Sequence, residues 1–160
     1  MNVIPKPQAP LFTVSQKPCF IDFQTEAETH THVTRLSLVN NTDSEWLAFD
    51  AVGNVWSFSY ERPAGGFSAF SRLLARSFYN PVSRVAVTWS QVRPYALDEL
   101  RQHYLDAIAA DDDILTQFVD PDELCARVRA CSTFQDFVAT WEWQSTDATF
   151  NDESESAGNA

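Results

Sequence analysis

The chain has 160 residues and a formal net charge of −11, and 44% of its residues are hydrophobic and 13% aromatic. This length and composition favour one globular domain and exclude wholesale disorder. No apolar run in the sequence approaches the ~20 residues that are needed to span a bilayer. The N-terminal stretch lacks the apolar core of a signal peptide and the three cysteines are unevenly spaced, so we expect a cytoplasmic protein without a disulfide framework.

Alternating apolar side chains predict β-strands in the first part of the chain. Residues 11–23 predict one or two strands interrupted at Lys17-Pro18, and residues 32–39 alternate cleanly and predict another. The turn-forming residues 40–44 end that second segment.

A hairpin is predicted next. Residues 45–51 and 55–60 flank Val52-Gly53-Asn54, where Gly53 and Asn54 tolerate the positive φ of a tight turn. We expect aromatic side chains to pair across its two strands, namely Trp46 with Trp56 and Phe49 with Phe58.

After this hairpin, apolar residues recur every three or four positions, which is the spacing of a helix. An apolar stripe predicts a helix that Asn80-Pro81 stops, and its members are Phe67, Phe70, Leu74 and Phe78. Residues 84–89 alternate again and predict a further strand.

The chain after Pro94 has helical periodicity. One apolar stripe comprises Leu97, Leu100, Tyr104, Ala107 and Ile108, and another comprises Phe134, Phe137, Val138 and Trp141. Helix starts are indicated at Asp120-Pro121 and at the capping box Ser132-Thr133-Phe134-Gln135.

Strands followed by helices predict an α+β fold. We expect an antiparallel sheet of about five strands with one inserted helix, covered on one face by the C-terminal helices. Residues 1–144 are expected to form this single domain. The acidic residues 145–160 contain one large apolar side chain, Phe150, and are expected to form a tail without structure.

Charge is distributed unevenly along the chain. Residues 1–97 contain seven acids and eight bases, whereas residues 98–160 contain fifteen acids and three bases and have a net charge of −12. If folding interleaves the two parts, the asymmetry supplies only internal ion pairs. If the acids share one face, their field attracts a basic partner.

Two further patterns have a functional and a purely structural interpretation. Glu26, Glu28, His30 and His32 have period two and could ligate a metal from one side of a strand, but they also suit a polar strand edge. A group of arginines and aromatics has the chemistry of a nucleic-acid-binding surface. The negative net charge of the chain disfavours that function. The members of the group are Arg72, Arg76, Arg84, Arg93, Tyr79 and Trp89.

Catalytic chemistry has no recognisable motif in this chain. We expect Cys19, Cys125 and Cys131 to be small buried apolar residues. The acidic run at residues 111–113 is expected to form a solvated turn. We therefore expect no enzymatic activity, no metal and no cofactor.

A protein-binding inhibitor is the function that this pattern favours. Acidic immunity proteins and antitoxins use a small rigid scaffold to block the basic active site of a nuclease or a similar toxin, and the analogy rests on charge and size alone. The expected partner is a basic protein, and neither nucleic acid nor a membrane. The alternatives are a DNA-mimicking protein directed against defence or restriction systems, and a small enzyme or interaction subunit.

The residues expected to bind the partner belong to the acidic C-terminal third. They are Asp98, Glu99, Asp106, Asp111, Asp112, Asp113, Asp120, Asp122, Glu123 and Trp143.

Overall fold

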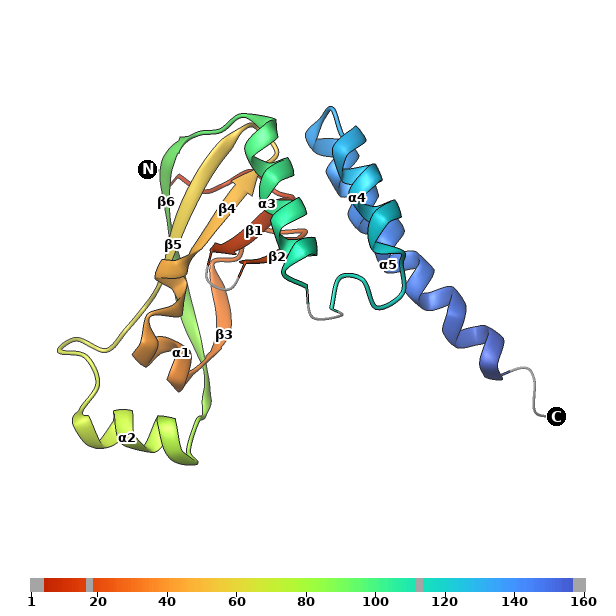
Figure 1. The fold of residues 1–160 in the computed structure, drawn as a ribbon. Coiled ribbons are helices and arrows are strands. Elements are labelled where there is room, and N and C mark those ends of the chain that lie inside the picture. Colours follow the sequence, from red (N-terminus) through yellow and green to blue (C-terminus); the bar gives the residue numbers. More distant parts are fainter. Residues whose placement is uncertain (1–4, 17–18, 112–113, 157–160) are drawn as a thin grey trace.

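The computed structural model describes residues 5–16, 19–111 and 114–156, and the side chains of residues 16 and 146–156 lie outside the description. The fold is α+β, as the sequence predicted (Figure 1). A curled antiparallel sheet of six strands forms a half-barrel with the strand order β2-β1-β4-β5-β6-β3. Helices α3, α4 and α5 follow the sheet in the chain, and their core side chains pack against one of its faces.

Two hairpins form the side of the sheet that carries these helices. β1 (Leu11–Gln16) pairs with β2 (Cys19–Gln24), so this segment supplies two strands, and the predicted interruption at Lys17-Pro18 lies outside the described residues. β4 (Trp46–Asp50) pairs with β5 (Asn54–Tyr60) and also with β1. Gly53 has φ +91° and supplies the positive φ of the second turn, as predicted.

The predicted aromatic pairs across the second hairpin are wrong. Its register places Trp56 opposite Ala48 and Phe49 opposite Val55. Trp56 instead donates an indole hydrogen bond of 2.8 Å to the carboxylate of Asp50. That fully buried carboxylate also accepts the amide N–H of Asn54, so the turn and its side chains set the register together.

The predicted strand over residues 32–39 is only half correct. β3 (His30–Thr34) pairs with β6 at the far edge of the sheet, but α1 (Arg35–Asn40) is a short helix. The hydroxyl oxygen of Thr34 accepts the amide N–H of Ser37, so Thr34 is the N-cap of α1 and ends the strand. A short 3-10 helix, η1 (Thr42–Glu45), then leads into β4.

The segment after β5 contains the predicted inserted helix and the longest strand. α2 (Ala69–Ser77) begins at Ser68, whose side chain accepts the amide N–H of Ser71. β6 (Val82–Pro94) is longer than the predicted 84–89 because it pairs with β5 along one side and with β3 along the other. α2 lies at the end of the molecule away from α4 and α5 (Figure 1).

The C-terminal helices are α3 (Leu97–Ala109), α4 (Pro121–Ala130) and α5 (Phe134–Ser156). Their predicted apolar stripes face the sheet: Phe12 of β1 packs against Tyr104 of α3 and against Phe137 and Trp141 of α5. Among the described residues, no helix combines the length and the apolar character needed to cross a bilayer.

The start of α5 differs by one residue from the predicted capping box. Thr133 accepts the amide N–H of Asp136, and the Asp136 carboxylate accepts the amide N–H groups of Ser132 and Thr133. Asp136 therefore has the role that the sequence analysis assigned to Gln135. The backbone of α5 continues past Ser145, and the domain boundary at residue 144 stays a prediction.

Candidate functional site

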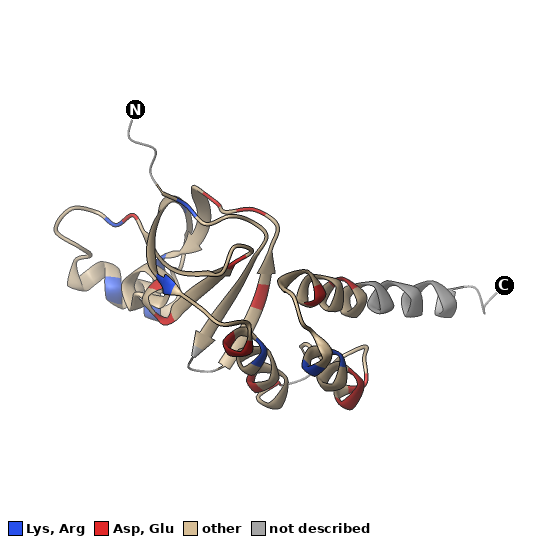
Figure 2. Ribbon diagram, turned by 90° about the horizontal axis from the view of Figure 1, so that it is seen from above, with Lys and Arg blue, Asp and Glu red and all other residues tan. Residues whose placement is uncertain are grey.

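The acids predicted to bind a partner are distributed over α3, α4 and the loop between them (Figure 2). On α3, Asp98 and Asp106 are exposed. Asp98 pairs with Arg101, and Asp106 accepts a hydrogen bond from the amide of Gln102. Both carboxylates are exposed to solvent, where such interactions are weak, so their charges remain accessible to a partner.

Glu99 is less accessible than its neighbours on α3. Its carboxylate accepts two hydrogen bonds from the guanidinium of Arg93, one of them 2.8 Å long, and lies 3.8 Å from the imidazole of His103. The hydrogen bonds from Arg93 hold the pKa of Glu99 below its ordinary value. This ion pair joins the end of β6 to the first turn of α3.

Asp111 has a structural role in the loop that follows α3. Its carboxylate accepts the amide N–H groups of Ile114, Leu115 and Thr116 at 2.9–3.0 Å. Although partial burial opposes the effect, these hydrogen bonds lower the pKa of Asp111. The predicted Asp112 and Asp113 lie outside the described residues.

On α4, only some of the predicted acids are available to a partner. Asp120 is the N-cap and accepts the amide N–H groups of Asp122 and Glu123, which confirms the predicted helix start. Glu123 pairs with Arg127 at 3.0 Å. The Asp122 side chain is exposed and makes no hydrogen bond or ion pair with any other described residue.

Trp143 of α5 is the one aromatic among the residues predicted to bind the partner. It is half-buried against the main core, and the guanidinium carbon of Arg127 lies 3.8 Å from its ring centroid. The ring therefore stabilises the contact between α4 and α5.

An apolar hollow of about 360 Å³ lies between α3, β2 and the loop after α3, and Asp111 is the predicted acid that lines it. Most of its lining is apolar, and the residues are Cys19, Phe20, Ala107, Ala110, Asp111, Ile114 and Leu115. Ile114 is 63% exposed and Phe118 47% exposed. Burial and the neighbouring carboxylate of Asp106 raise the pKa of the Cys19 thiol, so this lining cysteine is a neutral thiol at pH 7.

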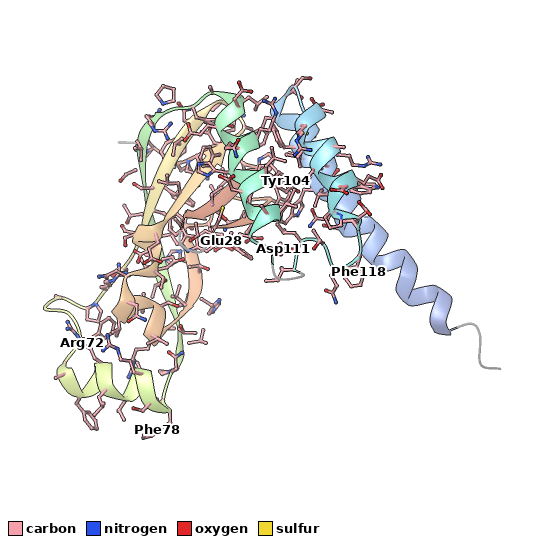
Figure 3. All side chains as sticks on the ribbon, viewed as in Figure 1. Glu28, Arg72, Phe78, Tyr104, Asp111 and Phe118 are labelled. Carbon is pink, nitrogen blue, oxygen red and sulfur yellow. The ribbon has the colours of Figure 1, made fainter. Side chains whose placement is uncertain are left out.

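The arginines and aromatics that the sequence analysis grouped together do not form one exposed surface in the structure. Arg72, Arg76 and Arg84 are exposed and none forms an ion pair within the described part of the chain. Arg93 pairs with Glu99, and Trp89 is buried. Figure 3 places Arg72 and Phe78 at the end of the molecule opposite Asp111 and Phe118.

The apolar stripe predicted for α2 is only partly covered: Phe67 packs against a small core cluster, but two other rings of the stripe are exposed. Phe78 is 85% exposed and Phe70 69% exposed, so these rings face solvent. The helix contacts α1, and Ala75 is its buried residue.

The period-two metal pattern is divided between two kinds of structure. β3 begins at His30, so Glu26 and Glu28 lie in the segment before the strand. Within residues 5–16, 19–111 and 114–156 no group of three potential metal ligands comes together.

A second hollow lies on the face of the sheet opposite α3, and the sequence analysis did not single it out. Six side chains from four strands line a cavity of about 190 Å³: Thr13, Asp22, Gln24, Trp46, Phe58 and Tyr60. These residues are far apart in the chain, and only the strand order β2-β1-β4-β5 brings them together. The alternation within each strand was the available signal, but it does not specify which strands are neighbours.

Searches of protein-family models, of curated proteins and of solved structures find no match to this chain.

Proposed function

We propose that this protein is a cytoplasmic binding protein without enzymatic activity, which neutralises a basic protein partner in the manner of immunity proteins and antitoxins. The observation that carries the proposal is the apolar hollow of about 360 Å³, which Asp111 lines and whose Cys19 thiol feels the charge of the exposed Asp106 on α3. Three unpaired cysteines support the reducing compartment.

The hollow and its surroundings have the composition of an interface. Interfaces combine a desolvated apolar centre with a polar rim, and a few anchor residues provide most of the binding free energy. Ile114 supplies exposed apolar surface in the hollow, Phe118 supplies more in the loop that follows, and Asp106 supplies charge nearby.

The acids differ in what they contribute. Asp111 and Asp120 are used for capping, so their replacement would change the loop and the helix rather than the interface alone. Asp98, Asp106 and Asp122 face solvent and supply the long-range field that accelerates association with a basic partner.

The first experiment identifies the partner by photo-crosslinking in cells. Ile114→benzoylphenylalanine places the crosslinker at the hollow, and Val52→benzoylphenylalanine is the control at a position that is 57% exposed on the β4–β5 turn. We expect an adduct with a basic protein from position 114 only. An acidic partner, or no adduct above that of the control, contradicts the proposal. If the crosslinked partner is a DNA-binding protein and added DNA competes with this chain for it, DNA mimicry takes the place of toxin inhibition as the proposed function.

The second experiment measures the association rate with that partner. Asp106→Lys with Asp122→Lys, and Glu45→Lys with Glu61→Lys, each change the net charge from −11 to −7. The first pair should slow association by about tenfold at low salt and less at high salt, because steering depends on local charge. Equal slowing by the control pair would leave net charge, and not this face, as the cause.

A further inference from the structure

The hollow opposite α3 is part of a longer depression on that face of the sheet. A smaller cavity of about 50 Å³ shares Gln24, Phe58 and Tyr60 with the cavity of about 190 Å³. It adds four residues, Glu28, Thr31, Val87 and Trp89. Because the two cavities share three side chains, they adjoin each other, and we call them together the aromatic trough.

Strand register explains why these side chains share one face. Thr13 lies opposite Asp22, and Ser15 lies opposite Trp46, so the side chains of β1, β2 and β4 alternate in phase. Phe58 lies opposite Trp89, and their ring centroids are 5.2 Å apart. The indole N–H of Trp89 donates a 2.8 Å hydrogen bond to the backbone carbonyl of Glu28, which holds the segment after β2 over this face.

Four polar side chains of the trough have no partner among the described residues. Within the described part of the chain, no hydrogen bond or ion pair is made by the carboxylate of Asp22, the amide of Gln24, the indole N–H of Trp46 or the hydroxyl of Tyr60. All four side chains are half-buried. Water reaches half-buried polar groups, and a ligand that enters the cavity can replace that water with hydrogen bonds of its own.

The charge of the trough selects the class of ligand. Its lining contains two carboxylates, Asp22 and Glu28, and no lysine or arginine. The faces of Trp46, Phe58 and Tyr60 attract cations through their negative quadrupole. Burial, with smaller effects from Asp43 and Glu28, raises the pKa of Tyr60, so its hydroxyl stays neutral at physiological pH.

The volume restricts the size of the ligand. Pockets for drug-sized molecules measure about 300–1,000 Å³, whereas this cavity measures about 190 Å³. It therefore suits a head group or a single side chain rather than a whole large molecule.

We propose that the aromatic trough binds an organic ammonium group, either the head group of a small quaternary amine or the methylated ammonium of a lysine side chain. The aromatic rings contact the methyl groups, and Asp22 and Glu28 balance the positive charge. This site lies on the other face of the sheet from the apolar hollow, so it does not depend on the proposed inhibition of a basic partner.

The test is a titration of the full-length protein followed by NMR at the indole N–H of Trp46, assigned with Trp46→Phe. The probes are choline, its uncharged isostere 3,3-dimethylbutanol, a trimethyl-lysine peptide and the same peptide with unmodified lysine. We expect choline to shift the Trp46 signal and to bind about tenfold more tightly than the isostere, a difference of about 1.4 kcal/mol. Tighter binding of the trimethylated peptide than of choline identifies a protein side chain as the source of the ammonium group.

Two variants separate the parts of the site. Asp22→Asn removes one charge with little change of shape and should weaken choline binding about tenfold, and the control Asp98→Asn removes the same charge from α3 and should leave it unchanged. Trp46→Leu, followed at the indole N–H of Trp89 in the same trough, should abolish choline binding. Thermal unfolding checks that this variant still folds, since Trp46 also packs on Phe20.

Three results would overturn the proposal. Equal affinity for choline and its isostere would show an apolar hollow without charge selection. A Trp46 shift caused by methyl glucoside and not by choline would identify a carbohydrate site. Unchanged choline binding in Asp22→Asn, together with unchanged binding in Trp46→Leu, would place the ligand elsewhere on the protein.

Discussion

The guanidinium of Arg127 lies between the carboxylate of Glu123, one turn earlier on α4, and the indole ring of Trp143 on α5. Both of these neighbours were predicted from the sequence to bind a partner. The structure shows that one arginine joins them within the molecule. The cation–π contact thus joins the two helices, and the ion pair within α4 holds the arginine in place.

We predict that Arg127→Ala destabilises the protein by about 1–2 kcal/mol, because it removes the cation–π contact and an exposed ion pair together. Urea unfolding at pH 7 measures the change. Arg129→Ala is the matched control, since Arg129 is exposed on the same helix and forms no ion pair with another described residue. A loss of the same size in the control would mean that helix propensity or net charge is the cause.

The pair of Asp43 and Arg62 predicts a pH dependence of stability. Asp43 is 3% exposed and accepts hydrogen bonds from Arg62 and from the amide of Tyr60. Burial acts to raise its pKa, but the hydrogen bonds from Arg62 and the backbone lower it overall. A lowered folded-state pKa adds stability above the unfolded pKa of about 3.9, and that stability is lost as pH falls through the folded pKa.

Asp43→Asn should therefore cost about 1.5–3 kcal/mol at pH 7, the usual contribution of a hydrogen bond to a charged group. The difference from wild type should shrink as the pH falls below about 4. Urea unfolding between pH 7 and pH 2.5 tests this, with Glu45→Gln as the control for an exposed acid near Asp43 in the chain. A difference that is constant with pH would show that the loss comes from packing.

A third prediction compares two phenylalanines. Phe137 is 0% exposed and lies between Phe12 and Tyr104, so Phe137→Ala should cost about 3–5 kcal/mol. Phe78 is 85% exposed, so Phe78→Ala should change the free energy of unfolding by less than about 0.5 kcal/mol. Thermal and urea unfolding measure both. A large loss from Phe78→Ala would mean that a second chain covers α2 in solution.

Local signals in the sequence predicted most of the secondary structure. Gly53 supplies the positive φ of a turn, and Asp120 followed by a proline starts a helix, because these effects act within a few residues. The apolar stripe through Phe137 predicted the core face of α5 for the same reason: one helix places every third or fourth side chain together.

Competition between local signals explains the errors in the elements. The apolar alternation of residues 32–39 favoured a strand, but the side chain of Thr34 caps a helix at Arg35. The aromatic pairs of the hairpin failed because Asp50 binds the turn and the Trp56 indole, and this sets a different register.

Only the tertiary structure decided which side chains are available at the surface. The acidic composition of the C-terminal third is a property of the sequence, but the division into capping acids such as Asp111 and free acids such as Asp122 depends on local folding around each carboxylate. The aromatic trough depends on the strand order, which brings Asp22, Trp46 and Tyr60 to one face. Strand order results from contacts between segments distant in the chain, and no pattern within a single strand specifies its neighbours.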